Sequence, residues 1–277
     1  MFENSPLLYV FAFIFGSVVG SFLNVCIYRL PREESIAFPP SHCPSCGKAI
    51  RFYHNIPILG YLSLRGKCAD CGSRISPVYP LVEALAAVMA VAVLWKFGLT
   101  INAAFYLALI YALIVITFID LQHMIIPNVI TIPGILVGLV FGALATDWGA
   151  SRALMERVGY DLGGFLILLN EVPFLDSVFG LLIGGGVLYV IAFLYVALRQ
   201  REGMGMGDVK LLAMLGAFLG WEGVVFIMLV SSILGTAAGL LVIFRKKGDL
   251  KYALPFGPFL SIAAVIYIFT GGFRALT

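Results

Sequence analysis

The sequence predicts an all-α fold: a polytopic membrane bundle of about eight transmembrane helices, with one small cytoplasmic loop domain that contains four cysteines. Apolar side chains make up 61% of the 277 residues, charged side chains make up 12%, and the mean hydropathy is +1.02. This composition excludes an ordinary soluble domain. Apolar runs of about 20 residues, long enough to cross about 30 Å of hydrocarbon as a helix, also recur along the chain.

Eight apolar segments are expected to cross the membrane. The chain begins with "MFENSPLL", which has no basic region before the first of these segments, and no small-residue cleavage site precedes the next loop. We therefore expect this segment to remain as a span and not to be removed as a signal peptide. The predicted segments are residues 7–28, 81–97, 101–120, 126–145, 178–198, 209–220, 224–244 and 256–273.

Lys and Arg residues are unevenly divided between the two sides of this predicted bundle. Thirteen lie in the loops of one side, seven of them in residues 29–80, and four lie on the other side. Basic loops stay in the cytoplasm, so we expect the N-terminus outside and the long first loop inside. The net charge of +3 reflects this topology and gives no support for nucleic-acid binding.

The long cytoplasmic loop contains two C-x-x-C pairs separated by 21 residues, "CPSC" and "CADC". Two such turns can together close a tetrahedral site of four thiolates, which is typical of a zinc knuckle. In a reducing cytoplasm, metal ligation is favoured over disulfides, while a redox pair or a lost site remain as alternatives. The expected Zn²⁺ ligands are Cys43, Cys46, Cys68 and Cys71, and the ion would order a loop with little apolar core.

Two aspartates lie at the cytoplasmic ends of predicted spans. Asp120 ends the third span and Asp208 begins the sixth. An ionisable group in or beside a span is a functional candidate, although Asp208 could be a helix N-cap and Asp120 an interfacial charge. Gly205 and Gly207 precede Asp208 and leave room for the backbone of a substrate, or simply form a flexible turn. Two such carboxylates could share a proton and activate water against an amide carbonyl.

Several separated motifs resemble those of the type IV prepilin peptidases, the bacterial leader peptidases and N-methyltransferases of the GxGD aspartyl protease group. The motifs are "GSFLNVCIYRLP" at 20–31, the two C-x-x-C pairs, "NIP" at 55–57, "YPLVE" at 79–83, "FIDLQHMIIPN" around Asp120 and "GMGDVKLLAMLGAFLGW" around Asp208. Three positions depart from the family pattern: Val78 and His42, where Arg is common, and Asn128, where Asp is common. The first two lie in the region that the family associates with methylation. Residues 146–176 match no motif of the family.

The resemblance implies cleavage of the leader of prepilins or type II secretion pseudopilins after a glycine, at the cytoplasmic face of the bacterial inner membrane. It also implies methylation of the new N-terminus with S-adenosylmethionine. Asp120 and Asp208 would be the catalytic pair, and the four cysteines would hold the metal. By analogy, Asn24, Asn55 and Glu83 would contribute to the S-adenosylmethionine site. Membrane lipid is the other expected partner.

The same resemblance divides the chain into three parts. Residues 1–28 would form the first transmembrane helix, 29–80 the zinc-binding loop domain that takes part in methylation, and 81–277 the peptidase bundle. Helix dipoles suggest a division of roles, in which Asp208, at a helix start, polarises the water. Asp120, at a helix end, would donate its proton to the carbonyl oxygen.

Two other classes of function remain open. An intramembrane protease resembling presenilin or signal peptide peptidase would share the aspartates, but it has no need of the four-cysteine loop. A cation- or proton-coupled transporter would place paired acids near the middle of the bilayer and would show ion flux.

Overall fold

The computed structural model confirms the all-α fold. It describes residues 5–147, 150–151, 154, 162–199, 205–245 and 254–272, and within these ranges it contains helices and two isolated β-bridges but no strand. The longer helices are α1 (Pro6–Arg29), α3 (Val78–Phe97), α4 (Ile101–His123), α5 (Asn128–Ala145), α7 (Leu162–Glu171), α8 (Pro173–Arg199), α9 (Met206–Arg245) and α10 (Gly257–Thr270). The long loop adds the short helices η1 (Leu30–Arg32), η2 (Phe52–His54) and α2 (Leu59–Ser63).

Six of the described helices are long and apolar enough to cross a membrane: α1, α3, α4, α5, α8 and α9. Many of their apolar side chains are exposed, such as Leu182 and Phe193 of α8 at 61% and 62%, as expected for surfaces that face lipid. The chain is therefore a multi-pass membrane protein. The predicted count of eight is not confirmed, because two predicted segments are merged in α9 and α10 has only 14 residues.

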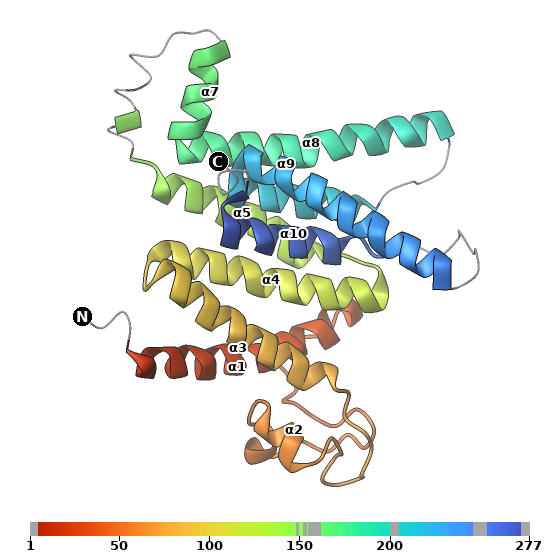
Figure 1. Cartoon of the computed structure of the whole chain (residues 1–277). Helices are drawn as coiled ribbons and strands as arrows, with labels where there is room; N and C mark the ends of the chain where they lie inside the picture. Colours follow the sequence, from red (N-terminus) through yellow and green to blue (C-terminus); the bar gives the residue numbers. More distant parts are fainter. Residues whose placement is uncertain are drawn as a thin grey trace. The chain divides into compact units, whose positions relative to one another are not determined.

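The chain divides into two compact units, Met1–Ile119 and Asp120–Thr277, with the boundary inside α4. In the first unit, α1 packs along α3, and the cysteine-containing loop connects the two helices (Figure 1). Glycines permit this close packing: a β-carbon on Gly16 would lie 2.7 Å from the Cα atom of Ala87, and one on Gly20 would lie 2.7 Å from the Cα atom of Glu83.

In the second unit, α9 is broken at Gly220, whose φ of 71° and ψ of −177° are not helical. A β-carbon on Gly184 of α8 would meet both Leu212 and Val224, so the parts of α9 before and after the break approach the same stretch of α8. The break frees the amide of Trp221, and this amide donates to Asp176 Oδ1 at 2.9 Å. Gly220 thus separates two helical parts that correspond to the predicted segments 209–220 and 224–244.

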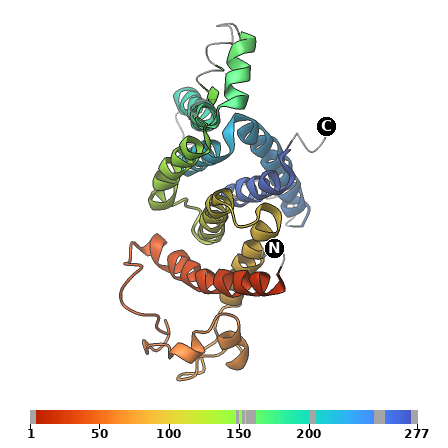
Figure 2. The same cartoon turned by 90° about the vertical axis from the view of Figure 1, so that its left-hand side faces the viewer.

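Helix α10 packs against the part of α9 that follows this break, as both views show (Figures 1 and 2). A β-carbon on Gly223 would lie 3.2 Å from the Tyr267 ring, and one on Gly235 would lie 3.5 Å from the Phe256 ring. The two segments are therefore antiparallel. Gly257, at the start of α10, is distant in sequence from Asp120 and Asp208 but belongs to the same unit.

Candidate functional site

Asp120 lies in the last turn of α4 and is only 4% exposed. Its Oδ2 atom accepts a buried hydrogen bond of 2.9 Å from the backbone N–H of Gly257, the first residue of α10. The bond joins residues that are 137 positions apart in the sequence. Asp120 is therefore held by a specific donor and is not a freely solvated interfacial charge.

Asp208 is the third residue of α9 and is half-buried. Because it lies inside the first turn, it does not precede the helix as an N-cap residue does. Within the described part of the chain, its carboxylate has no hydrogen-bond partner. Ile126 packs against Gly207, directly before Asp208, and against Gly257, whose N–H holds Asp120, so the two carboxylates belong to one neighbourhood of the second unit. The structure thus brings the two predicted residues together.

Ile126 lies in the connection between α4 and α5. Its side chain packs against the start of α9, which carries Asp208, and against the start of α10, which holds Asp120. A β-carbon on Gly207 would lie 2.8 Å from Ile126 Cβ, and one on Gly257 would lie 3.4 Å from Ile126 Cδ1. The space left by Gly207 is thus filled by Ile126, whereas Gly205 is exposed and a β-carbon there would lie 3.7 Å from Asp208 Oδ2. Of the two glycines expected at the substrate's approach, only Gly205 leaves open space beside Asp208.

A second contact joins the start of α5 to the start of α9. Lys210 Nζ donates to Asn128 Oδ1 at 2.8 Å, and the contact is exposed. Asn128 is the position where the resembling family commonly has Asp. In this chain Lys210 therefore donates a hydrogen bond to the side-chain amide of Asn128, whereas an Asp at that position would form an ion pair with it.

The four cysteines of the loop form one cluster in the first unit. Their sulfur atoms all lie within 4.8 Å of one another, and all four are free thiols. The two turns match: Gly47 N–H donates to Cys43 O and Gly72 N–H to Cys68 O, and both glycines have a positive φ, near 70°. Only glycine adopts that conformation without strain, so each C-x-x-C-G sequence folds locally into the same turn.

The surroundings of two of the cysteines, Cys43 and Cys71, favour thiolates, whereas desolvation and the neighbouring Cys43 and Cys71 sulfurs raise the pKa of Cys46 to about 11. Backbone amides of Cys46 and Ser45 lower the pKa of the Cys43 thiol to about 6. The hydroxyl of Ser73 lowers the pKa of Cys71, from which it lies 3.1 Å away. The four sulfur atoms are close enough to ligate one metal ion, and backbone amides and a hydroxyl group can donate hydrogen bonds to them. Such a set suits a tetrahedral metal ion of the zinc type.

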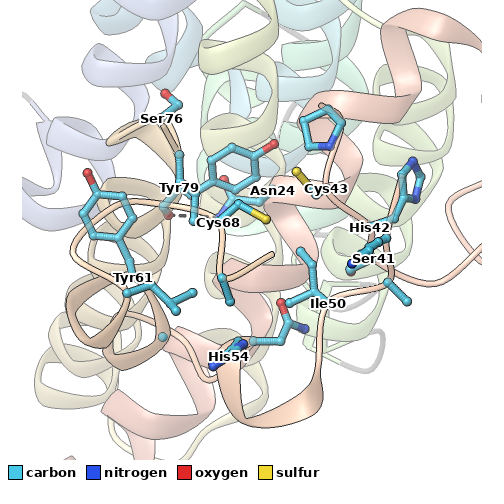
Figure 3. Close-up of a pocket in the computed structure, with 18 of the residues that line it drawn as sticks. Asn24, Ser41, His42, Cys43, Ile50, His54, Tyr61, Cys68, Ser76 and Tyr79 are labelled. Atoms are coloured by element: carbon cyan, nitrogen blue, oxygen red, sulfur yellow. Dashed lines mark hydrogen bonds between the residues drawn. The ribbon is translucent and has the colours of Figure 1, made fainter. Parts of the chain in front are cut away.

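A cavity of about 390 Å³ lies in the first unit between the cysteine loop and the adjoining parts of α1 and α3 (Figure 3). Asn24, Asn55 and Glu83, the three residues expected near a methyl donor, all line it. Cys43 and Cys68 line it as well, so the cysteine cluster and the cavity share a wall. The structure therefore brings together polar residues from three separate motifs.

Two of these polar side chains also hold the backbone of the cavity wall. Asn24 Nδ2 donates to Tyr79 O at 3.0 Å, which ties α1 to the start of α3. Glu83 is 8% exposed, and its Oε2 atom accepts from Ile58 N–H at 2.7 Å. Ile58 has φ 62° and ψ −52°, and Leu59 N–H donates to Pro57 O at 2.6 Å. This is a strained γ-turn, and Glu83 anchors it.

Sequence reasoning missed Gly257 and Ile126. Gly257 stands in "PFGP", at the start of the last predicted apolar segment, and a glycine flanked by prolines at a helix start could have served as the signal. Ile126 carries no such signal, because an isoleucine beside a span is ordinary. Its position between two glycines of different helices is visible only in the fold.

Comparisons with known proteins find two family models and several relatives that match most of the chain. The model of the Bacterial Peptidase A24 N-terminal domain matches residues 14–97, and that of the Type IV leader peptidase family matches residues 107–240. A prepilin leader peptidase/N-methyltransferase of Pseudomonas putida is 34% identical over 94% of this chain and 90% of its own length. Proteins of the same name from Aeromonas hydrophila and Myxococcus xanthus are 35% and 38% identical, covering 94% and 86% of this chain and 89% and 64% of theirs. No solved structure matches the chain.

Proposed function

The chain belongs to the type IV leader peptidase family, and from this premise we propose that it cleaves the leader from type IV prepilins or type II secretion pseudopilins and then methylates the new N-terminus. The observation that carries the peptidase half is the pair of carboxylates, Asp120 and Asp208, held in one neighbourhood at two helix ends of one unit. The four-cysteine cluster favours this function over an intramembrane protease that lacks such a loop.

Cleavage adds water across one amide bond. The water oxygen bonds to the carbonyl carbon of the leader's last glycine while one carboxylate accepts a water proton and the other aspartate, in its acid form, protonates the carbonyl oxygen. The C–N bond of the resulting intermediate then breaks, and the leaving nitrogen takes up a proton. The leader ends in a carboxylate, and the mature protein begins with a free amine.

The open space beside Gly205 supports an approach of the substrate backbone to Asp208 from that side. Asp208 has no hydrogen-bond partner among the described residues, which suits a group that must hold a water. Asp120 has one oxygen committed to Gly257 N–H. The proposed roles remain a water-polarising Asp208 and a proton-donating Asp120.

Methylation would use the cavity between the cysteine loop and α1 and α3. Its volume, about 390 Å³, lies within the range of small-molecule sites, and it is lined by amide and carboxylate side chains, Asn24, Asn55 and Glu83. S-adenosylmethionine, when bound there, supplies an electrophilic methyl group for the new amine. The residues of the chain would bind and orient the donor, with Asn24 and Glu83 also keeping the wall in place.

We further propose that the cysteine cluster holds Zn²⁺. Cys43, Cys46, Cys68 and Cys71 would be the ligands, and the ion would join the two turns and so stabilise the loop domain. Its role would be structural, because four protein ligands leave no open position for a substrate.

The proposed setting is the bacterial inner membrane, with the N-terminus outside and the active site at the cytoplasmic face. This orientation follows from the excess of basic residues in the loop 29–80 and after the fifth and seventh predicted spans. A prepilin with a basic leader and an apolar helix would then present its cleavage site at the membrane edge. The division into residues 1–28, 29–80 and 81–277 also remains a proposal.

Cleavage of a purified prepilin in detergent tests the peptidase half. We expect cleavage by the wild type and a loss of at least about a thousandfold in Asp120→Asn and Asp208→Asn, with both variants folded, because each aspartate has a separate proton-transfer role. Cleavage by either variant at the wild-type rate would exclude that aspartate from catalysis. Ion flux without cleavage would instead favour a transporter.

Transfer of label from S-adenosylmethionine to the cleaved pilin tests the second half. We expect label on the new N-terminal amine only after cleavage, since the amine does not exist before it. Complete cleavage with no label, under conditions in which the donor is stable, would limit the protein to proteolysis.

A further inference from the structure

Asp120 is held in place by the backbone of another helix. The N–H of Gly257 donates to Oδ2 of Asp120 over 2.9 Å in a buried setting. Gly257 is the first residue of α10, so this N–H is one of those that have no partner inside the helix. The contact therefore satisfies both the helix start and the buried carboxyl group.

The donor also determines which oxygen of Asp120 can carry a proton. A backbone amide only donates, so the oxygen that it contacts must be an acceptor and carries no proton along that direction. Oδ2 is thus committed to Gly257. The donated hydrogen bond makes Oδ2 the less basic oxygen, so the proton of the acid form is held preferentially on Oδ1, where it can exchange with water or a carbonyl oxygen.

Glycine is required at this position for a steric reason. A β-carbon on residue 257 would lie 2.7 Å from Asp120 Oδ2, closer than such atoms approach, and 3.4 Å from Ile126 Cδ1. Because Ile126 also fills the space at Gly207, directly before Asp208, a displacement of Ile126 would reach the start of α9 as well. The two glycines and Ile126 thus connect the surroundings of the two aspartates.

We propose that Gly257 is a positioning residue of the aspartate site: its N–H fixes the orientation of Asp120 so that Oδ1 is the reacting oxygen, and its missing side chain permits that contact. The inference rests on the proposed peptidase function. Gly257 does not take part in the chemistry itself and acts through Asp120.

The test replaces the backbone N–H group of Gly257 with an oxygen atom. Glycolic acid in place of Gly257 converts the amide N–H to an ester oxygen and keeps the size of the residue. We expect kcat for prepilin cleavage to fall roughly tenfold or more, because the carboxylate that Asp120 becomes as it donates its proton loses a hydrogen bond, while KM stays within about twofold. Gly257→Ala should lower kcat at least as far.

Gly239→Ala is the matched control, since its β-carbon would meet only Leu254 Cδ1, at 3.6 Å. It should cleave as the wild type does. Thermal unfolding in detergent reports whether the variants are folded. Methyl transfer to a pre-cleaved pilin should stay at the wild-type rate, because the proposed cavity for that reaction lies in the other unit.

A wild-type kcat in the ester variant would overturn the proposal, as would a fall in kcat/KM that comes from KM alone. If Gly257→Ala does not fold, the ester variant decides. Absence of cleavage by the wild type itself would count against the proposed function, and it is distinguished from failure of this inference because the inference concerns only the ratio of variant to wild type.

Discussion

Glu83→Ala should release the strained turn at Ile58. In the folded protein, Ile58 N–H donates to Glu83 Oε2 at 2.7 Å, and Glu83 is 8% exposed. A hydrogen bond to a charged group contributes about 1.5–3 kcal/mol. The positive φ of Ile58 costs about 1–3 kcal/mol, and a β-branched residue does not adopt it readily. The free energy of the hydrogen bond and the cost of the positive φ are of similar size, so the turn is no longer favoured when Glu83 is removed.

Hydrogen exchange over residues 55–64 measures this effect. A loss of about 2 kcal/mol corresponds to exchange that is roughly 30-fold faster at protected amides of this segment. Glu83→Gln is the matched control, because its amide oxygen can still accept from Ile58, and it should exchange more slowly than Glu83→Ala. Ile58→Gly in the alanine background should reduce the difference, since glycine adopts a positive φ without strain.

The same variant separates the two proposed activities. Because the turn neighbours Asn55 and Ile56, which line the cavity, Glu83→Ala should reduce methyl transfer while leader cleavage continues. Exchange over 55–64 that stays at the wild-type rate in Glu83→Ala would refute the reasoning, because it would mean that the turn is stable without its acceptor.

Two further predictions concern the first unit. Gly16→Leu should destabilise the packing of α1 on α3 by about 1–3 kcal/mol, because even a β-carbon added at this position would lie 2.7 Å from Ala87 Cα. Thermal unfolding in detergent measures this effect. Gly186→Ala is the control, since a β-carbon there would meet nothing within 4 Å. Cys68→Ser should lower the amount of bound zinc and release the 21-residue segment between the two C-x-x-C pairs, whose closure is worth roughly 3 kcal/mol. Trypsin should therefore cleave the loop faster in this variant. A wild-type metal content in Cys68→Ser would contradict the cluster as a metal site.

Local patterns were sufficient for much of the fold. Apolar segments predicted helices in the right places, because a span in lipid must satisfy its own backbone hydrogen bonds and helix formation follows from its composition. The break at Gly220 falls at the boundary predicted between segments 209–220 and 224–244. The count of eight did not follow, since a 14-residue helix such as α10 and a broken helix such as α9 are not distinguished by hydropathy alone.

Some features of the site were likewise predictable from local sequence and others were not. The C-x-x-C-G turns form from neighbouring residues, so spacing alone predicted that Cys43, Cys46, Cys68 and Cys71 would gather. Glu83 was expected to meet a ligand, and the structure adds a second task, because the strained backbone of Ile58 depends on its carboxylate. That dependence was not predictable, since neither residue carries a local signal of the other.

The sequence by itself determined the apolar segments, the two C-x-x-C-G turns and the two aspartates at the ends of predicted spans, because hydropathy and turn geometry depend on residues close together in the chain. Only the tertiary structure decided which groups hold those aspartates. Gly257 reaches Asp120 across 137 positions, and Ile126 lies between Gly207 and Gly257, because helices that are distant in sequence pack closely where glycines remove the side chains between them.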